Sequence, residues 1–162
     1  MIASNSTPII VLGKQGMLTL LKECFKKVII QESVYYEIMH EENSPEAAAL
    51  KKAISDEWLR VEKITINRFL QTKNIGLGEK EAISLALKHK GPLLIDDDNS
   101  KAYASMMGLE SHGTLYVVYL SKAKKLISKE EAINIIDAMI EDGFYVSTQI
   151  YSKFLELLNS LG

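Results

Sequence analysis

The stretch from Leu93 to Asp98 constrains the fold most strongly, because three aliphatic residues run directly into three aspartates. A short apolar run of this kind, after Gly91 and Pro92, is typical of a fully buried strand. Open α/β sheets place their ligand sites at the carboxyl ends of strands. Hard divalent cations such as Mg²⁺ and Mn²⁺ prefer oxygen ligands and would relieve the repulsion among three carboxylates. The stretch therefore predicts a metal site, with a solvated turn or the N-cap of a following helix as the structural alternative.

Length and composition fit one globular domain over residues 1–162, with 47% apolar and 25% charged residues. The net charge is −2, so contact with nucleic acid would need a local basic patch. The single cysteine, Cys24, excludes an intramolecular disulfide and favours a reducing cytoplasm. No apolar run approaches the roughly 18–20 residues that span a bilayer, and no basic region precedes the first apolar stretch. We therefore expect a cytoplasmic protein with no membrane span.

Short apolar segments alternate with helical patterns along the chain. We expect strands near residues 1–4, 27–30 and 92–95, with a candidate edge strand at 58–61. A helix is predicted over 99–107, with Ala102 and Met106 as core candidates, and residues 112–114 are predicted to form a loop. Strands separated by helices imply a parallel sheet with helices on both faces. The predicted fold class is therefore α/β, with four or five parallel strands.

The segment 76–81 contains two glycines followed by a helical pattern with Glu79 and Glu81 in its first turn. Acids at this position interact favourably with the helix dipole by about 0.3–1 kcal/mol, which is a sufficient structural explanation. Glu79, however, has apolar residues at the third, fourth and seventh positions after it and so shares the buried face. Glu81 lies about 200° further around the helix. Since a carboxylate on a buried face is costly without a partner, Glu79 is the strongest single candidate.

Other segments bring polar groups to the same edge of the predicted sheet. Asn5 follows the first strand, and Glu37 lies in the helix after the second strand, at the border of its apolar face. Glu37 can also be interpreted as a glutamate in solvent. Lys101, in the first turn after the acidic stretch, lies within reach of the acidic cluster.

The chain resembles a PIN-domain protein, and within that superfamily the branch called DUF3368. The matching elements are Ser4–Ile10, Val34–Ile38, Gly76–Ile83, Leu94–Asp97, and Gly108–Leu109 followed by Gly113–Thr114. Each element alone is weak, but the five occur in order and cover nearly the whole chain. The resemblance implies a three-layer PIN-like fold, in which helices flank a central parallel sheet and acids cluster at its C-terminal edge.

The resemblance also implies a ribonuclease that depends on Mg²⁺ or Mn²⁺. It places the acidic positions of the family at Asn5, Glu37, Glu79 and Asp97, with Asp96 as the alternative for the last. Asn5 departs from the family pattern, because this position is usually Asp. An amide oxygen can still bind a divalent cation, but it contributes no negative charge. We therefore expect weak metal binding.

One or two divalent ions can activate a water, neutralise a phosphate and stabilise the leaving oxygen. By the resemblance, Glu37, Glu79 and Asp97 would hold the metal and form the catalytic set, and Glu79 or Asp97 would orient the attacking water. Thr7 falls on the small hydroxyl position that often accompanies the first acid, and Lys101 is a candidate phosphate contact. The expected activity is endoribonucleolytic cleavage of single-stranded RNA, whose backbone is accessible.

Partners and alternatives follow from the same resemblance. Many small members of the family are toxins neutralised by an antitoxin protein, and members usually form dimers. Tyr151, Phe154 and Leu158 of the last helix are candidates for an apolar dimer interface, unless they only close the core. A catalytically weak or inactive PIN-like module that binds RNA or protein remains the alternative function. A phosphoryl-transfer domain of the receiver type fits less well, because its N-terminal acidic pair and late lysine are missing.

Overall fold

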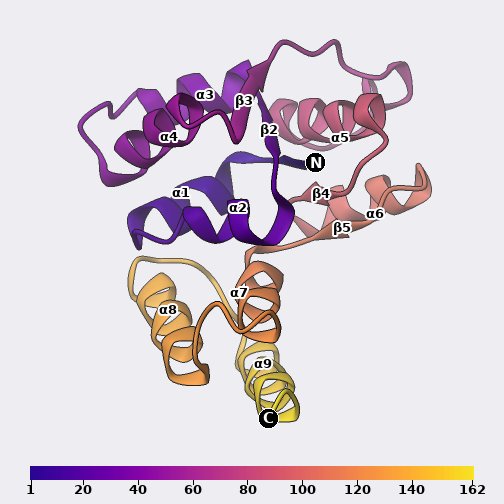
Figure 1. The fold of residues 1–162 in the computed structure, drawn as a ribbon. Helices are drawn as coiled ribbons and strands as arrows, with labels where there is room; N and C mark the ends of the chain where they lie inside the picture. The colour runs from indigo at the N-terminus through magenta and orange to yellow at the C-terminus, as the bar shows by residue number, and fades with distance from the viewer.

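The computed structural model describes residues 1–162 and contains one sheet of five parallel strands in the order β3-β2-β1-β4-β5 (Figure 1). The strands are β1 (Ile2–Ser4), β2 (Val28–Gln31), β3 (Leu59–Glu62), β4 (Leu93–Leu94) and β5 (Ser111–His112). The predicted α/β class with four or five parallel strands is confirmed. Because β1 lies between β2 and β4, the ends of these three strands meet at one edge of the sheet.

The three central strands β1, β2 and β4 are short, buried and mostly apolar because helices cover both faces of the sheet, whereas the edge strands β3 and β5 carry polar residues. The helices are α1 (Ser6–Lys14), α2 (Thr19–Phe25), α3 (Glu32–Met39), α4 (Pro45–Ser55), α5 (Leu77–His89), α6 (Asp98–Met106), α7 (Thr114–Ala123), α8 (Lys129–Glu141) and α9 (Thr148–Ser160), with a 3₁₀ turn at Arg68–Leu70. The sheet therefore forms the middle layer of a three-layer arrangement.

Alternate residues of the strands supply two separate cores. Ala3, Ile29, Leu93 and Ile95 pack with the apolar face of α5 and with α6. The alternating strand residues, such as Ile30, point to the other face of the sheet and pack there with most of the other helices. This alternation decides which side chains at the strand ends face α5.

Helices α7, α8 and α9 extend away from the sheet on the side opposite α5, and the C-terminus lies at the end of this extension (Figure 1). Helix α8 begins with a capping box, in which Ser128 and Glu131 each accept the other's backbone N–H. No helix is long and apolar enough to cross a membrane.

Two details of the predicted secondary structure were wrong. Residues Ser111 and His112 form the edge strand β5, where part of a loop was expected, because they pair with Leu93 and Leu94. Ala102 and Met106 are exposed, Met106 to 71%, whereas Ala104 is buried. Helix α6 packs against α5 and β5 with Ser100 and Ala104 on its buried side, so the predicted face is turned towards solvent.

Two of the three residues predicted for an apolar dimer interface are buried in the structure. Phe154 and Leu158 are buried and close the core. Ile150 and Leu157 of the same helix are exposed, and they border an apolar hollow of about 360 Å³ between α7 and α9. A dimer remains a prediction, but Phe154 and Leu158 are not available to form it.

Candidate functional site

Asn5 lies where β1 ends and α1 begins, and it is almost fully buried. Its backbone N–H donates to the carbonyl oxygen of Leu94 (2.9 Å), which continues the pairing of β1 with β4. Although Asn5 occupies the N-cap position of α1, its side chain makes no capping hydrogen bond. The Nδ2 atom instead lies 3.4 Å from Glu79 Oε1. The Asn5 side chain therefore bonds to α5 and does not cap α1.

Glu79 lies in the first turn of α5 and is half-buried. Its carboxylate folds back over Gly76, where a Cβ atom would lie 2.0 Å from Glu79 Oε2. Glycine at position 76 therefore leaves the space that the carboxylate occupies. The structure thus brings Asn5 and Glu79 together, although 74 positions separate them in the sequence.

Glu81 was expected to face elsewhere than Glu79. It is half-buried and contacts α3, where its carboxylate accepts a hydrogen bond from Ser33 Oγ. Glu37 follows Ser33 by one helical turn and therefore lies on the same face of α3. The Glu37 side chain is exposed. The structure places Glu37 near the α3–α5 contact and does not bring it into contact with Glu79.

The acidic stretch after β4 divides into three different environments. Asp96 accepts hydrogen bonds from the N–H (2.8 Å) and the hydroxyl (2.7 Å) of Thr114, the first residue of α7. Asp97 is the N-cap of α6, and its Oδ2 accepts from the N–H (2.8 Å) and hydroxyl (2.6 Å) of Ser100. Asp98 is exposed. Both oxygens of Asp96 are therefore engaged, whereas Asp97 keeps Oδ1 free of protein partners.

The two predicted RNA contacts lie apart from each other. Lys101 is half-buried beside the Asp96 turn, and its Nζ lies 3.3 Å from the position that a Cβ on Gly113 would take. Thr7 borders a hollow of about 220 Å³ between α1 and the end of α8. Lys101 is thus close to the acidic turn, while the Thr7 side chain faces another part of the molecule.

Two polar residues at this edge were missed by the sequence analysis. Thr114 is fully buried and holds Asp96. Gln31, the last residue of β2, is 1% exposed, and its Nε2 donates to the carbonyl oxygen of Gly78 (2.9 Å). The Gln31 Oε1 atom is buried without a partner. The available signal was that Gln31 is polar and ends a strand at the same edge as Asn5.

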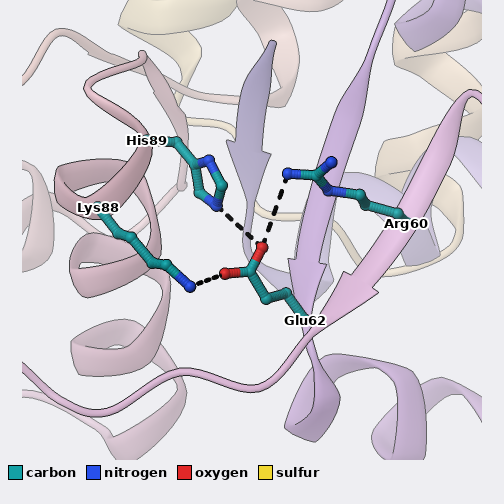
Figure 2. A network of polar contacts seen from close by, with 4 residues as sticks. All are labelled: Arg60, Glu62, Lys88 and His89. Carbon is teal, nitrogen blue, oxygen red and sulfur yellow. Dashed lines mark hydrogen bonds and ion pairs between the residues drawn. The ribbon is translucent and has the colours of Figure 1, made fainter.

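An ion network fixes α5 over the sheet (Figure 2). Glu62 Oε2 lies 2.9 Å from His89 Nε2 and 3.7 Å from Arg60, and the other carboxylate oxygen pairs with Lys88. The hydrogen bond from Lys88, assisted by His89, lowers the pKa of Glu62 against the opposing effect of partial burial. Because Glu62 lies opposite Gln31 in the sheet, this network supports the strand that borders the candidate site.

Whether a metal ion fits at the carboxyl ends of the central strands depends on which side-chain oxygen atoms are available there as ligands. No three of the His, Cys, Asp and Glu side chains are grouped so that they could hold an ion. The edge does gather the amide of Asn5, the carboxylate of Glu79 and the unpaired amide oxygen of Gln31. Hard cations accept amide as well as carboxylate oxygens. The residues therefore fit a weakly bound divalent cation, with little protein charge to hold it.

The chain is similar in sequence to one family of known proteins. No curated protein matches the chain. A solved structure of a PilT N-terminus domain protein from Sulfolobus solfataricus P2 is similar over 72% of this chain and 90% of that one, with 15% identity and a TM-score of 0.48. The model of the family DUF3368, described as a PIN domain, matches residues 1–160. The chain therefore belongs to the DUF3368 family of PIN domains, whose fold is of the nuclease type.

Proposed function

We propose that this protein is an endoribonuclease that depends on Mg²⁺ or Mn²⁺ and cleaves single-stranded RNA. The observation that carries the proposal is the contact between Asn5 and Glu79 at the edge where β1 and β4 end. It brings a carboxylate of one helix to the end of the central strand, beside the turn that carries Asp96 and Asp97. This edge is the usual ligand site of parallel sheets.

The residues have separate roles in this proposal. Asn5 and Glu79 hold the cation, and Asp97 contributes through its free Oδ1 atom. Asp96 is the weaker alternative to Asp97, because Thr114 occupies both of its oxygens. Glu37, exposed on α3, is an outer ligand or a site for a second ion.

Phosphodiester hydrolysis requires a nucleophilic water and neutralisation of the phosphate. A divalent cation held by these residues would supply both. Glu79, whose carboxylate lies over Gly76, or Asp97 would also orient the attacking water. Lys101 contacts a backbone phosphate and so positions the RNA without reading its sequence. Thr7 as an RNA contact remains a prediction, since its side chain lies towards α8.

Glu79→Gln provides the decisive test, because it keeps the shape of the side chain and removes its charge. Cleavage of a labelled single-stranded RNA is measured with Mn²⁺ and with a chelator. We expect the wild type to cleave slowly with Mn²⁺ only, and Glu79→Gln to lose this activity while remaining folded. The matched control is Glu141→Gln, an exposed glutamate of α8. Glu81 is unsuitable as a control because it contacts Ser33. Equal activity of the wild type and Glu79→Gln would rule out the nuclease mechanism.

A second function is favoured by one observation, the amide at position 5 in a site that lacks three grouped carboxylates. In this alternative the protein is a catalytically weak or inactive PIN-like module that binds RNA or another protein. No detectable cleavage by the wild type, together with activity in Asn5→Asp, would support it.

We further propose that the protein acts in the cytoplasm as the toxin of a toxin–antitoxin pair and forms a homodimer. The support for this proposal is the match of residues 1–160 to the PIN-domain family. A neighbouring gene that encodes a small DNA-binding protein would support the pairing. Light scattering at micromolar concentration tests the dimer, and a monomer mass would contradict it.

A further inference from the structure

Gln31 is a buried polar side chain on the face of the sheet that α5 covers. It ends β2, and Ile29, two residues earlier on the same face, packs in the core beneath α5. The Gln31 Nε2 atom donates to the carbonyl oxygen of Gly78 in the first turn of α5, at 2.9 Å. The NH₂ group of the amide therefore has a structural role, because its hydrogen bond attaches the start of α5 to β2.

The carbonyl oxygen of the same amide has no hydrogen-bond partner. Gln31 Oε1 is buried and has no hydrogen-bond donor within reach. A buried acceptor of this kind costs free energy unless a ligand satisfies it. Because Gln31 is only 1% exposed, no nucleotide or partner side chain can reach the oxygen without rearrangement. Only an ion or a water molecule is small enough.

The position of this oxygen relates it to the candidate metal site. Ala3 lies opposite Ile29 in the sheet, so extending the register by two residues places Asn5 opposite Gln31. Both side chains point towards the first turn of α5, where Asn5 Oδ1 lies 3.7 Å from the position of a Cβ on Gly78. Glu79 is the next residue along that turn. The side chains of Asn5, just after β1, and of Gln31, at the end of β2, therefore both lie beside the first turn of α5, which carries Glu79.

We propose that Gln31 supplies a neutral amide oxygen to the divalent cation of this site, directly or through one bound water. The proposal rests on the proposed function, since it concerns the same cation. The cation would then be held by the amides of Asn5 and Gln31 and the carboxylate of Glu79. Such a site holds a cation more weakly than an all-carboxylate site, because the ligands carry less charge.

The test measures Mn²⁺ binding to the full chain without RNA, by electron paramagnetic resonance of free Mn²⁺ and by the Mn²⁺-induced rise in melting temperature. Gln31→Met keeps the length of the side chain and removes its oxygen. It should weaken Mn²⁺ binding by about tenfold or more, as loss of ligands or of their partners commonly does. Gln31→Glu keeps an oxygen and adds charge, so it should tighten Mn²⁺ binding severalfold.

Each variant has a matched control. Gln15→Met removes a side-chain hydrogen bond at the far end of α1, where Gln15 Nε2 donates to Asp142 (2.7 Å). Gln149→Glu adds the same charge at an exposed position in α9. Both controls should bind Mn²⁺ as the wild type does.

The direction in which Gln31→Glu changes Mn²⁺ affinity shows whether Gln31 is a metal ligand or only a structural residue. Glutamate cannot donate to the Gly78 carbonyl, so a purely structural Gln31 would make Gln31→Glu bind Mn²⁺ no better than Gln31→Met. That result, or unchanged binding in both variants, overturns the role of Gln31 while leaving the proposed nuclease intact. A wild type that binds no Mn²⁺ overturns the role of Gln31 and the metal dependence of the proposed function together. If Gln31→Met fails to fold, Gln31→Glu alone decides.

Discussion

Replacement of Thr114 by valine tests whether Asp96 is a structural anchor or a free ligand. Valine has nearly the same shape as threonine but lacks the hydroxyl that donates to Asp96 Oδ2 at 2.7 Å. The backbone N–H of residue 114 still reaches Oδ1. The variant therefore leaves one carboxylate oxygen without its donor, in a half-buried position next to a fully buried side chain.

The expected cost follows from the chemistry of this bond. A hydrogen bond to a charged group contributes about 1.5–3 kcal/mol, and partial exposure of Asp96 places the value near 2 kcal/mol. In a domain of this size, that cost lowers the melting temperature by about 4–8 °C. Urea denaturation followed by circular dichroism at pH 7 measures the free energy of unfolding. Thr114→Ser, which keeps the hydroxyl, should lose less than Thr114→Val.

A matched control is available in α9. Thr148, like Thr114, is the first residue of its helix, but it is exposed. Thr148→Val should change the free energy of unfolding by less than about 0.5 kcal/mol. If Thr114→Val costs no more than Thr148→Val, Asp96 is not anchored to α7 and is free to act as a ligand. A double-mutant cycle with Asp96→Asn should show a coupling energy of about 1 kcal/mol or more.

Four further predictions concern the site and its support. Asn5→Asp should tighten Mn²⁺ binding in calorimetry, because it restores a charge at the end of β1; no change would show that Asn5 is not a ligand. Glu62→Gln should cost about 1 kcal/mol at pH 7. Because the fold lowers the pKa of Glu62 below its ordinary value of 4.5, this loss should shrink as the pH falls through the folded-state pKa, which urea denaturation at pH 7 and at successively lower pH checks. Gly13→Ala should destabilise the protein by about 1–3 kcal/mol, because a Cβ there would lie 2.9 Å from Glu46 Cα and force α1 and α4 apart; unchanged stability would contradict this packing. Cys24 should react slowly with iodoacetamide in the native state at pH 8, because burial raises the pKa of its thiol, and denaturation should restore the rate; fast native alkylation would contradict this.

The local pattern of the chain was sufficient to predict the three central strands and the polar edge at which they end, but not the edge strand β5. An apolar run followed by acids predicted a buried strand that ends at a polar turn, and β4 with Asp96 and Asp97 has this form. The phase of Glu79 on its helix predicted an inward-facing carboxylate, and the carboxylate does face Asn5. Periodicity succeeds here because it depends only on near neighbours along the chain.

The partners of each polar group were decided by tertiary structure. The sequence did not show that Thr114 would occupy both oxygens of Asp96, or that Gln31 would attach β2 to α5. It also did not show that Phe154 and Leu158 would be covered, because all apolar residues of an amphipathic helix look alike until its neighbours are placed. Sequence fixes which face of an element is apolar and which residue types stand at its ends. Only the packing of distant elements determines which donor meets which acceptor, and so whether a carboxylate at the edge of the sheet is an anchor or is free to bind a cation.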